Sequence, residues 1–300
     1  MKDIDNILLN FTPSSLILLN AILAIVMFSI ALDLRKDDFT TLLAAPKPLL
    51  TGLTSQFIVL PTVTYLMIVA VEPRASIALG LILIAACPGG NISNFITHMA
   101  GGNTALSVSM TAFATVSATL LTPINIAFWG SLYPPTREIL AQTSIDPIQI
   151  AITITFMLFL PLVIGIWLNT TKPEMATRVR RPMQILSMVI FVTFVVLALA
   201  ANWSFFLSYA WMVAGLVLLH NALALGSGFT IASVMRLSPY NRRAITIETG
   251  IQNSGLGLVL IFGFFNGLGG MAVVAAFWGI WHAISGMALA KFLSRTEAQR

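Results

Sequence analysis

The sequence of 300 residues contains little charge and only one cysteine. Charged residues make up 9% of the chain, hydrophobic residues make up 57%, and the mean hydropathy is +0.91. So little charge is typical of a multi-pass membrane protein and excludes an ordinary soluble domain. The single cysteine, Cys87, excludes a disulfide framework and a cysteine cluster for zinc.

Other features are also missing. The first residues do not resemble a cleavable leader, because Lys2 is followed by Asp3 and the first apolar stretch is long enough for a full span. No basic stripe with interleaved aromatic residues is present, so nucleic acid is not an expected partner. No linker divides the chain. We therefore expect one integral-membrane domain over 1–300, with short tails at 1–13 and 291–300.

Apolar runs of about 20 residues predict an all-α integral membrane fold with about nine transmembrane helices. The predicted spans are 14–33, 49–71, 76–99, 104–131, 147–168, 183–200, 207–235, 244–266 and 271–290.

Lysine and arginine residues are unevenly distributed over the connections between these spans. Of the 16 lysine and arginine residues, only Lys2, Arg74 and Arg137 fall on the side that holds the N-terminus. The positive-inside rule therefore predicts an N-terminus outside the cell and a cytoplasmic C-terminus, in the plasma (inner) membrane.

The run PGGNISN, which begins at Pro88, interrupts the third predicted span. Pro88 removes a backbone donor, and Gly89 and Gly90 permit dihedrals that a helix does not use. Unwound backbone at membrane depth persists only where it is buried in protein or lines a wet cavity. The freed carbonyls and the side-chain oxygens of Ser93 and Asn94 are hard ligands that suit an alkali cation. A plain proline–glycine kink is the alternative.

The run GIQNSG at 250–255 interrupts the eighth predicted span, shortly after the carboxylate of Glu248. An acidic residue at a bilayer centre costs about 2.5–3.5 kcal/mol by one insertion scale, so it predicts a functional site. Gln252 lies four residues after Glu248 and shares its helix face. Asn253 and Ser254 add further polar groups at the same interruption.

Three more polar side chains interrupt apolar spans: Gln56, Ser107 and Thr111. Each alone is more often an interhelical hydrogen-bonding group than a ligand. Together with Glu248 they supply neutral oxygens around one negative charge. Such a set fits a monovalent cation better than magnesium or calcium, whose sites use more carboxylates.

The two interruptions fall in spans separated by an odd offset, which inverts the second relative to the first. Inverted repeats with a midplane site made of discontinuous helices are a common plan of secondary transporters. This arrangement predicts a transporter and no enzymatic activity.

The two runs, read together, resemble the paired signature of the bile acid:sodium symporter family. The segments are CPGGNISNFITHMAGGNTALSVSMTAFATVSATLLTP at 87–123 and IETGIQNSGLGL at 247–258. The resemblance covers nearly the whole chain and implies a panel of helices beside a core in which two discontinuous helices cross. It also implies sodium-coupled symport of an organic anion, either a small organic acid or a bile-acid-like carboxylate. The chain is similar to the nine-span form of the family.

The resemblance implies two sodium sites. The first would use Ser93, Asn94, Ser107, Thr111 and Glu248. The second would use Gln56, Glu248 and Gln252, with the backbone oxygens of Thr249 and Ile251. The organic substrate would contact Asn253 and His282, and also Gly90 and Asn91 in the first interruption.

In the expected cycle, two sodium ions neutralise Glu248 before the anion binds. Inward movement of a net charge of +1 gains about 2.3 kcal/mol per 100 mV of inside-negative potential. We expect membrane lipid to surround the protein. A monomer is sufficient for this cycle.

Several alternatives stay open. A proton-coupled carrier is the main one, because Glu248 and His282 can both titrate. An intramembrane protease would pair Ser227 with His282, but the G-x-S-x-G context is absent. A channel fits poorly, since a single buried carboxylate is not a conductive ring. An arsenite-type efflux carrier would depend on Cys87, which we expect to serve packing, as we expect of His98 and His220.

Overall fold

The computed structural model describes residues 4–6, 24–25, 27–29, 31–32, 46–90, 92–142, 147–201 and 203–298. Within these ranges every regular element is a helix, and one isolated antiparallel bridge joins Gly89 to Gln252. The predicted all-α class is confirmed for this part of the chain.

The N-terminal half contains a short 3-10 turn and six helices: Ile4–Asn6, α3 (Pro46–Thr54), α4 (Leu60–Val71), α5 (Ala75–Ala86), α6 (Ile92–Met99), α7 (Thr104–Leu132) and α8 (Pro134–Gln142). A π-helical turn, Ser55–Val59, joins α3 to α4 without a break. The C-terminal half contains α9 (Pro147–Thr171), α10 (Pro173–Ala201), α11 (Trp203–Val234), α12 (Pro239–Gly250), α13 (Ser254–Phe264) and α14 (Gly269–Ala298).

Four of the described helical segments are long and apolar enough to cross a membrane: Pro46–Val71, Thr104–Leu132, Phe206–Val234 and Gly269–Ser294. Three shorter apolar helices accompany them: Ala75–Ala86, Leu158–Thr171 and Ser254–Phe264. The protein is therefore a multi-pass membrane protein. The first predicted span, 14–33, lies largely outside the described residues, and the total of nine spans stays a prediction.

Helix α5 lies at the centre of the bundle. Every residue from Ser76 to Ala86 is buried, and the helix contacts α4, α7 and α14. A Cβ atom at Gly80 would lie 2.9 Å from the backbone of Met271, so the glycine permits close packing of α5 against α14. Because α5 is apolar on all sides, it is buried all round rather than amphipathic.

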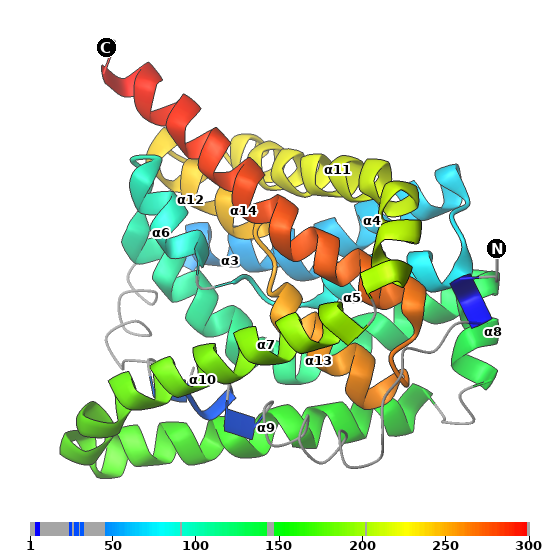
Figure 1. Cartoon of the computed structure of the whole chain (residues 1–300). Coiled ribbons are helices and arrows are strands. Elements are labelled where there is room, and N and C mark those ends of the chain that lie inside the picture. Colours follow the sequence, from blue (N-terminus) through cyan, green and yellow to red (C-terminus); the bar gives the residue numbers. More distant parts are fainter. Residues whose placement is uncertain are drawn as a thin grey trace.

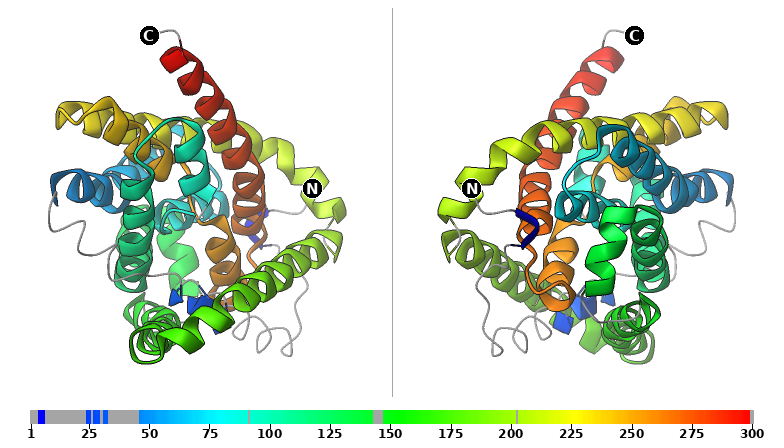
Figure 2. Two further views of the ribbon diagram at one scale, coloured as in Figure 1. Left: turned by 90° about the vertical axis from the view of Figure 1, so that its left-hand side faces the viewer. Right: turned by 90° about the vertical axis from the view of Figure 1, so that its right-hand side faces the viewer.

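Helices α9 and α10 lie together along one side of the molecule, and α11, α12 and α14 lie on the opposite side (Figure 1). The C-terminal end of α14 extends beyond the neighbouring helices (Figure 2). In both views of Figure 2, α9 and α10 lie at the bottom of the molecule, below the segments that contain the interruptions.

Two polar connections are more helical than the hydropathy pattern indicates. The connection between the fourth and fifth predicted spans contains α8, which begins at Pro134. Helix α10 begins at Pro173, ten residues before the predicted span at 183–200. Proline suits the first turn of a helix because its missing N–H is not needed there, and polar residues do not prevent a helix outside the apolar layer.

Candidate functional site

The two predicted interruptions are both present, and they cross each other. Helix α5 ends at Ala86 and α6 begins at Ile92, while α12 ends at Gly250 and α13 begins at Ser254. The extended segments between them run antiparallel at the Gly89–Gln252 bridge (Figure 1).

The crossing segments satisfy each other's backbone groups. The Gly90 N–H donates to the Ile251 carbonyl at 2.9 Å, and the Asn253 N–H donates to the Pro88 carbonyl at 2.8 Å. Backbone groups freed from a helix inside a membrane must find such partners. Each interruption therefore depends on the other.

The carboxylate of Glu248 lies directly against the first interruption. Its side chain is fully buried, and a Cβ atom at Gly89 would collide with it. Position 89 therefore requires glycine, because the backbone lies so close to the carboxylate that no Cβ atom fits between them.

Three hydroxyl groups surround the two carboxylate oxygens. Ser93 donates to Glu248 Oε2 at 2.5 Å and Ser107 donates to the same atom at 2.9 Å. Thr111 donates to Oε1 at 2.6 Å. No basic side chain of the described residues pairs with Glu248. The buried negative charge is therefore balanced only by neutral donors.

These hydroxyl groups face more acceptors than they have protons. Ser107 also reaches Asn94 Oδ1 at 2.8 Å, and Thr111 reaches the same oxygen at 3.2 Å and the Ser107 carbonyl at 3.1 Å. Each hydroxyl carries one proton and cannot donate to all of these atoms. The cluster of Ser93, Asn94, Ser107, Thr111 and Glu248, here called the carboxylate cluster, therefore has unused oxygen lone pairs around a negative charge.

The position of Ser93 and Asn94 corrects one expectation. Both were predicted to lie in unwound backbone, but they lie in the first turn of α6, which begins at Ile92. The Ser93 N–H donates to the Gly90 carbonyl at 2.8 Å, so the chain re-enters a helix immediately after the glycines. The interruption therefore contributes backbone groups to the site around Glu248, and α6 contributes the side chains of Ser93 and Asn94. Asn91 lies outside the described residues.

A second group of polar atoms lies where the π-helical turn meets the end of α12. Gln56 is fully buried in the π-helical turn, and neither polar atom of its side chain has a partner among the described residues. Gln252 was predicted to share a helix face with Glu248, but α12 ends at Gly250 because the chain leaves the helix to pair with Gly89. Gln252 donates from Nε2 to the Thr249 carbonyl at 2.8 Å, but its Oε1 has no partner among the described residues. A bond of 2.9 Å between the Ser55 and Thr249 hydroxyls brings the turn beside the end of α12.

Buried amide atoms without partners are unfavourable unless a ligand satisfies them. The Oε1 atoms of Gln56 and Gln252 are hard oxygen ligands. The carbonyls of Thr249 and Ile251 each accept one bond and keep a second lone pair. The set, here called the glutamine group, suits a cation of low charge.

Among the predicted substrate residues that the structure describes, Asn253 and Gly90 lie at the crossing and His282 lies on α14. The Asn253 side chain accepts from the Leu256 N–H at 3.0 Å and so caps the N-terminus of α13. Gly90 is buried at the crossing, and His282 on α14 is 6% exposed with Nδ1 lacking a partner among the described residues.

Two important contacts were not predicted. Thr122 on α7 donates to the carbonyl of Ala86, the last residue of α5, at 2.6 Å. Asn221 on α11 donates to the carbonyl of Gly250, the last residue of α12, at 2.8 Å, and accepts from Ser285 at 2.6 Å. Both side chains hold a helix-end carbonyl that the interruption leaves without its own partner. The sequence signal that could have predicted these contacts is a polar residue inside an apolar span, which both Thr122 and Asn221 are.

The structure does not support an intramembrane protease. Ser227 donates to the Ala224 carbonyl at 2.9 Å rather than to a histidine. His220 is fully buried, bonds Thr64 at 2.7 Å and packs on Trp278. Within the described residues, no group of three His, Cys, Asp or Glu side chains could hold a metal ion.

Comparison with known proteins gives a consistent result. Residues 20–209 match the sodium bile acid symporter family. A Bacillus subtilis protein named as an uncharacterized sodium-dependent transporter, YocS, is 31% identical over 91% of this chain and 82% of its own length. The chloroplast protein BASS1 of Arabidopsis thaliana, named as a probable sodium/metabolite cotransporter, is 31% identical over 93% of this chain and 67% of its own.

A sodium-dependent organic anion transporter from Mus musculus is 30% identical over 92% of this chain and 76% of its own length. The family match covers the first interruption, and these relatives align with most of the chain. The structure contains the two crossing interruptions that the resemblance predicted. By the family match and these relatives, the chain belongs to the sodium bile acid symporter family.

Proposed function

We propose that this protein is a sodium-coupled symporter that carries an organic anion across the membrane by alternating access. The observation that carries the proposal is the carboxylate cluster, in which one buried charge lies beside two crossing helix interruptions with no basic partner among the described residues. The sodium-dependent relatives support the choice of ion.

The first sodium ion would bind in the carboxylate cluster. Ser93, Ser107 and Thr111 can each turn a hydroxyl proton away and present a lone pair, which Asn94 Oδ1 already does. Glu248 provides the single negative charge, so one monovalent ion makes the site neutral. A divalent ion normally takes more carboxylate ligands than the single one that this site offers.

The second sodium ion would bind in the glutamine group. Gln56 and Gln252 would supply amide oxygens, and Thr249 and Ile251 would supply carbonyls. Because Glu248 lies only four residues before Gln252 in the chain, its charge stabilises both ions. Sodium binding would therefore fix the end of α12 against α6, α7 and the π-helical turn.

The anion would bind next to the interruption, near Asn253, His282, Gly90 and Asn91. Helices α6 and α13 both begin at the crossing, and helix N-termini favour negative charge. A small organic acid or a bile-acid-like carboxylate fits this requirement. Binding after sodium follows, because the sodium ions first remove the repulsion from Glu248.

The wider architecture in this proposal is a single transport domain of about nine spans with a panel and a core. The antiparallel crossing supports an inverted repeat, in which α5–α6 corresponds to α12–α13. The N-terminus would lie outside and the C-terminus in the cytoplasm of a plasma (inner) membrane. A monomer contains both ion sites.

Uptake into proteoliposomes tests the transport function. Vesicles with an inward sodium gradient would be supplied with labelled monocarboxylates and a bile acid, beside vesicles with an inward potassium gradient. We expect sodium-specific accumulation that increases when a potassium diffusion potential makes the interior negative. Accumulation driven by a proton gradient, with no effect of sodium, would instead favour a proton-coupled carrier.

Gln56→Leu tests the glutamine group. Leucine has a similar size and no polar atoms, so it removes two buried atoms without partners and should leave the sodium-free protein as stable or more stable. We expect sodium affinity to fall by about tenfold, because one oxygen ligand is lost. Thermal unfolding with and without sodium measures both effects. Loss of stability without a change in sodium affinity would contradict the assignment.

Asn253→Ala separates substrate contact from helix capping. Asn253 caps α13, and Asn103 caps α7 with the same contact to a backbone N–H at 3.0 Å. Each substitution should cost about 1 kcal/mol of stability. We expect only Asn253→Ala to weaken anion uptake, measured as the apparent Michaelis constant at saturating sodium. Equal apparent Michaelis constants in the two variants would mean that Asn253 serves only as a helix cap.

A further inference from the structure

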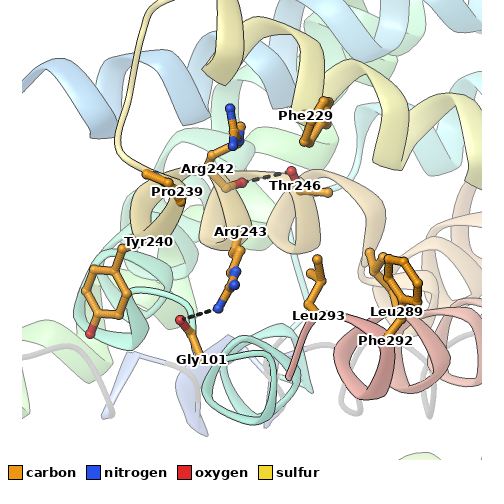
Figure 3. Close-up of a pocket in the computed structure, with 10 residues that line it drawn as sticks. All are labelled: Gly101, Phe229, Pro239, Tyr240, Arg242, Arg243, Thr246, Leu289, Phe292 and Leu293. Carbon is orange, nitrogen blue, oxygen red and sulfur yellow. Dashed lines mark hydrogen bonds between the residues drawn. The ribbon is translucent and has the colours of Figure 1, made fainter. Parts of the chain in front are cut away.

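A separate cavity of about 880 Å³ lies between α11, α12 and the C-terminal part of α14, closed at one side by the turn after α6. Figure 3 shows its lining residues, which are mainly aromatic, leucine and arginine residues, with Pro239, Thr246 and, in the turn, Gly101. The cavity combines an apolar surface with two positive charges.

The two charges are Arg242 and Arg243, which are adjacent on α12 and point to different sides of the cavity (Figure 3). Arg242 lies 5.0 Å from the ring centre of Phe229 and reaches Ser233 Oγ at 3.4 Å. Arg243 donates to the carbonyls of Ala100 and Gly101 at 3.0 and 3.2 Å. These contacts hold both guanidinium groups in place, and neither group can lose its charge.

The cavity is distinct from the carboxylate cluster. Thr246 lines the cavity, whereas Glu248 lies two residues further along α12, about 200° around the helix. The two sites therefore lie on opposite faces of the same helix. A ligand in the cavity would contact α12 without contacting the sodium ligands.

Most of the remaining lining is apolar. Phe229 is 51% exposed and Phe292 is 65% exposed, and Leu289 and Leu293 on α14 are half-buried. Exposed side chains of this kind on a membrane protein contact lipid tails. Arginines beside them at a helix end, with the exposed aromatic ring of Tyr240, are typical of the level of lipid head groups.

We propose that this cavity binds an anionic phospholipid, whose phosphate lies against α12 in the positive field of Arg242 and Arg243 and whose acyl chains lie along Leu289, Phe292 and Leu293. Arginine suits phosphate because its planar fork donates two parallel hydrogen bonds. The apolar wall explains why a lipid, rather than a free anion, is the expected ligand. The proposal is independent of the transported substrate.

Binding of short-chain lipids to the protein in neutral detergent tests the proposal. The probes are dioctanoyl phosphatidylglycerol, dioctanoyl phosphatidylcholine and the deacylated head group glycerophosphoglycerol, with bound lipid counted by native mass spectrometry. We expect phosphatidylglycerol to bind about tenfold more tightly than either of the other two. Equal binding of the two lipids would overturn the proposal, and equal binding of the deacylated head group would indicate a free-anion site instead.

Arg242→Gln and Arg243→Gln locate the binding. Lys291→Gln is the matched control, because Lys291 is exposed at the same end of α14 but lies about 200° around the helix from the lining residue Leu289. We expect each arginine variant to lose about tenfold in affinity and the lysine variant to keep it. The same loss in all three would mean a diffuse charge effect and would overturn the site. If Arg243→Gln unfolds because its carbonyl contacts are lost, Arg242→Gln and the wild-type lipid comparison still decide.

Discussion

Sodium-driven transport is expected to disappear when Glu248 is replaced by glutamine. Glutamine keeps the shape of the side chain but removes the only charge in the carboxylate cluster, which is fully buried. Removing one partner of a buried ionic contact costs about 3–5 kcal/mol, so sodium binding should weaken by about 100-fold or more. Sodium titrations of the purified variant and sodium-dependent uptake both measure the change.

The sign of the stability change distinguishes an ion site from a structural contact. Without sodium, the Glu248→Gln variant should unfold at the same temperature as the wild type or higher, because a buried charge has been removed. Glu138→Gln, at an exposed position on α8, is the control and should change neither property. Retained sodium dependence in Glu248→Gln, or a large loss of stability without sodium, would contradict the proposed role.

Gly89→Ala should disable the same site from the other interruption. The added methyl group would collide with the Glu248 carboxylate, and the neighbouring backbone is held by its bridge to Gln252. Overpacking of a closely packed site costs about 1–3 kcal/mol, and here the carboxylate must also move away from its hydroxyl partners. We therefore expect lower thermal stability and sodium affinity reduced by at least about tenfold.

Gly226→Ala provides the comparison for Gly89→Ala. Gly226 lies within α11, and no atom of a neighbouring element lies within 4 Å of the position of an added Cβ. Alanine at this position should raise stability by up to about 1 kcal/mol, because it favours the helix, and sodium affinity should be unchanged. If both alanine variants behave alike, the close approach of Gly89 to the carboxylate has no functional importance.

The positions of both interruptions could be predicted from the sequence, because proline, glycine and clustered polar residues together disfavour a continuous helix inside an apolar run. Pro88 and Gly250 both fall at the crossing in the structure. Ser107 and Thr111, which are four residues apart on α7, both donate to the Glu248 carboxylate. These features depend on the chemistry of residues that are close in the sequence, so the sequence alone is enough to predict them.

Features that depend on packing between distant segments were not predictable in the same way. The contact of Ser55 with Thr249 joins residues 194 positions apart, and no local pattern indicates it. Asn221 was overlooked because a single polar residue in an apolar span can serve several structural roles. The π-helical turn at Gln56 has no clear sequence signal, although such turns occur often at functional sites.

The central claim is that sodium binds at the crossing, and a thermal-unfolding titration tests it most directly. The purified protein would be titrated with sodium chloride and with potassium chloride at constant ionic strength, beside Glu248→Ala and Gln252→Ala. A bound ion stabilises the folded state in proportion to the logarithm of its concentration once the site is saturated. We predict stabilisation by sodium alone that is lost in both variants, whereas equal effects of sodium and potassium on the wild-type protein would contradict the claim.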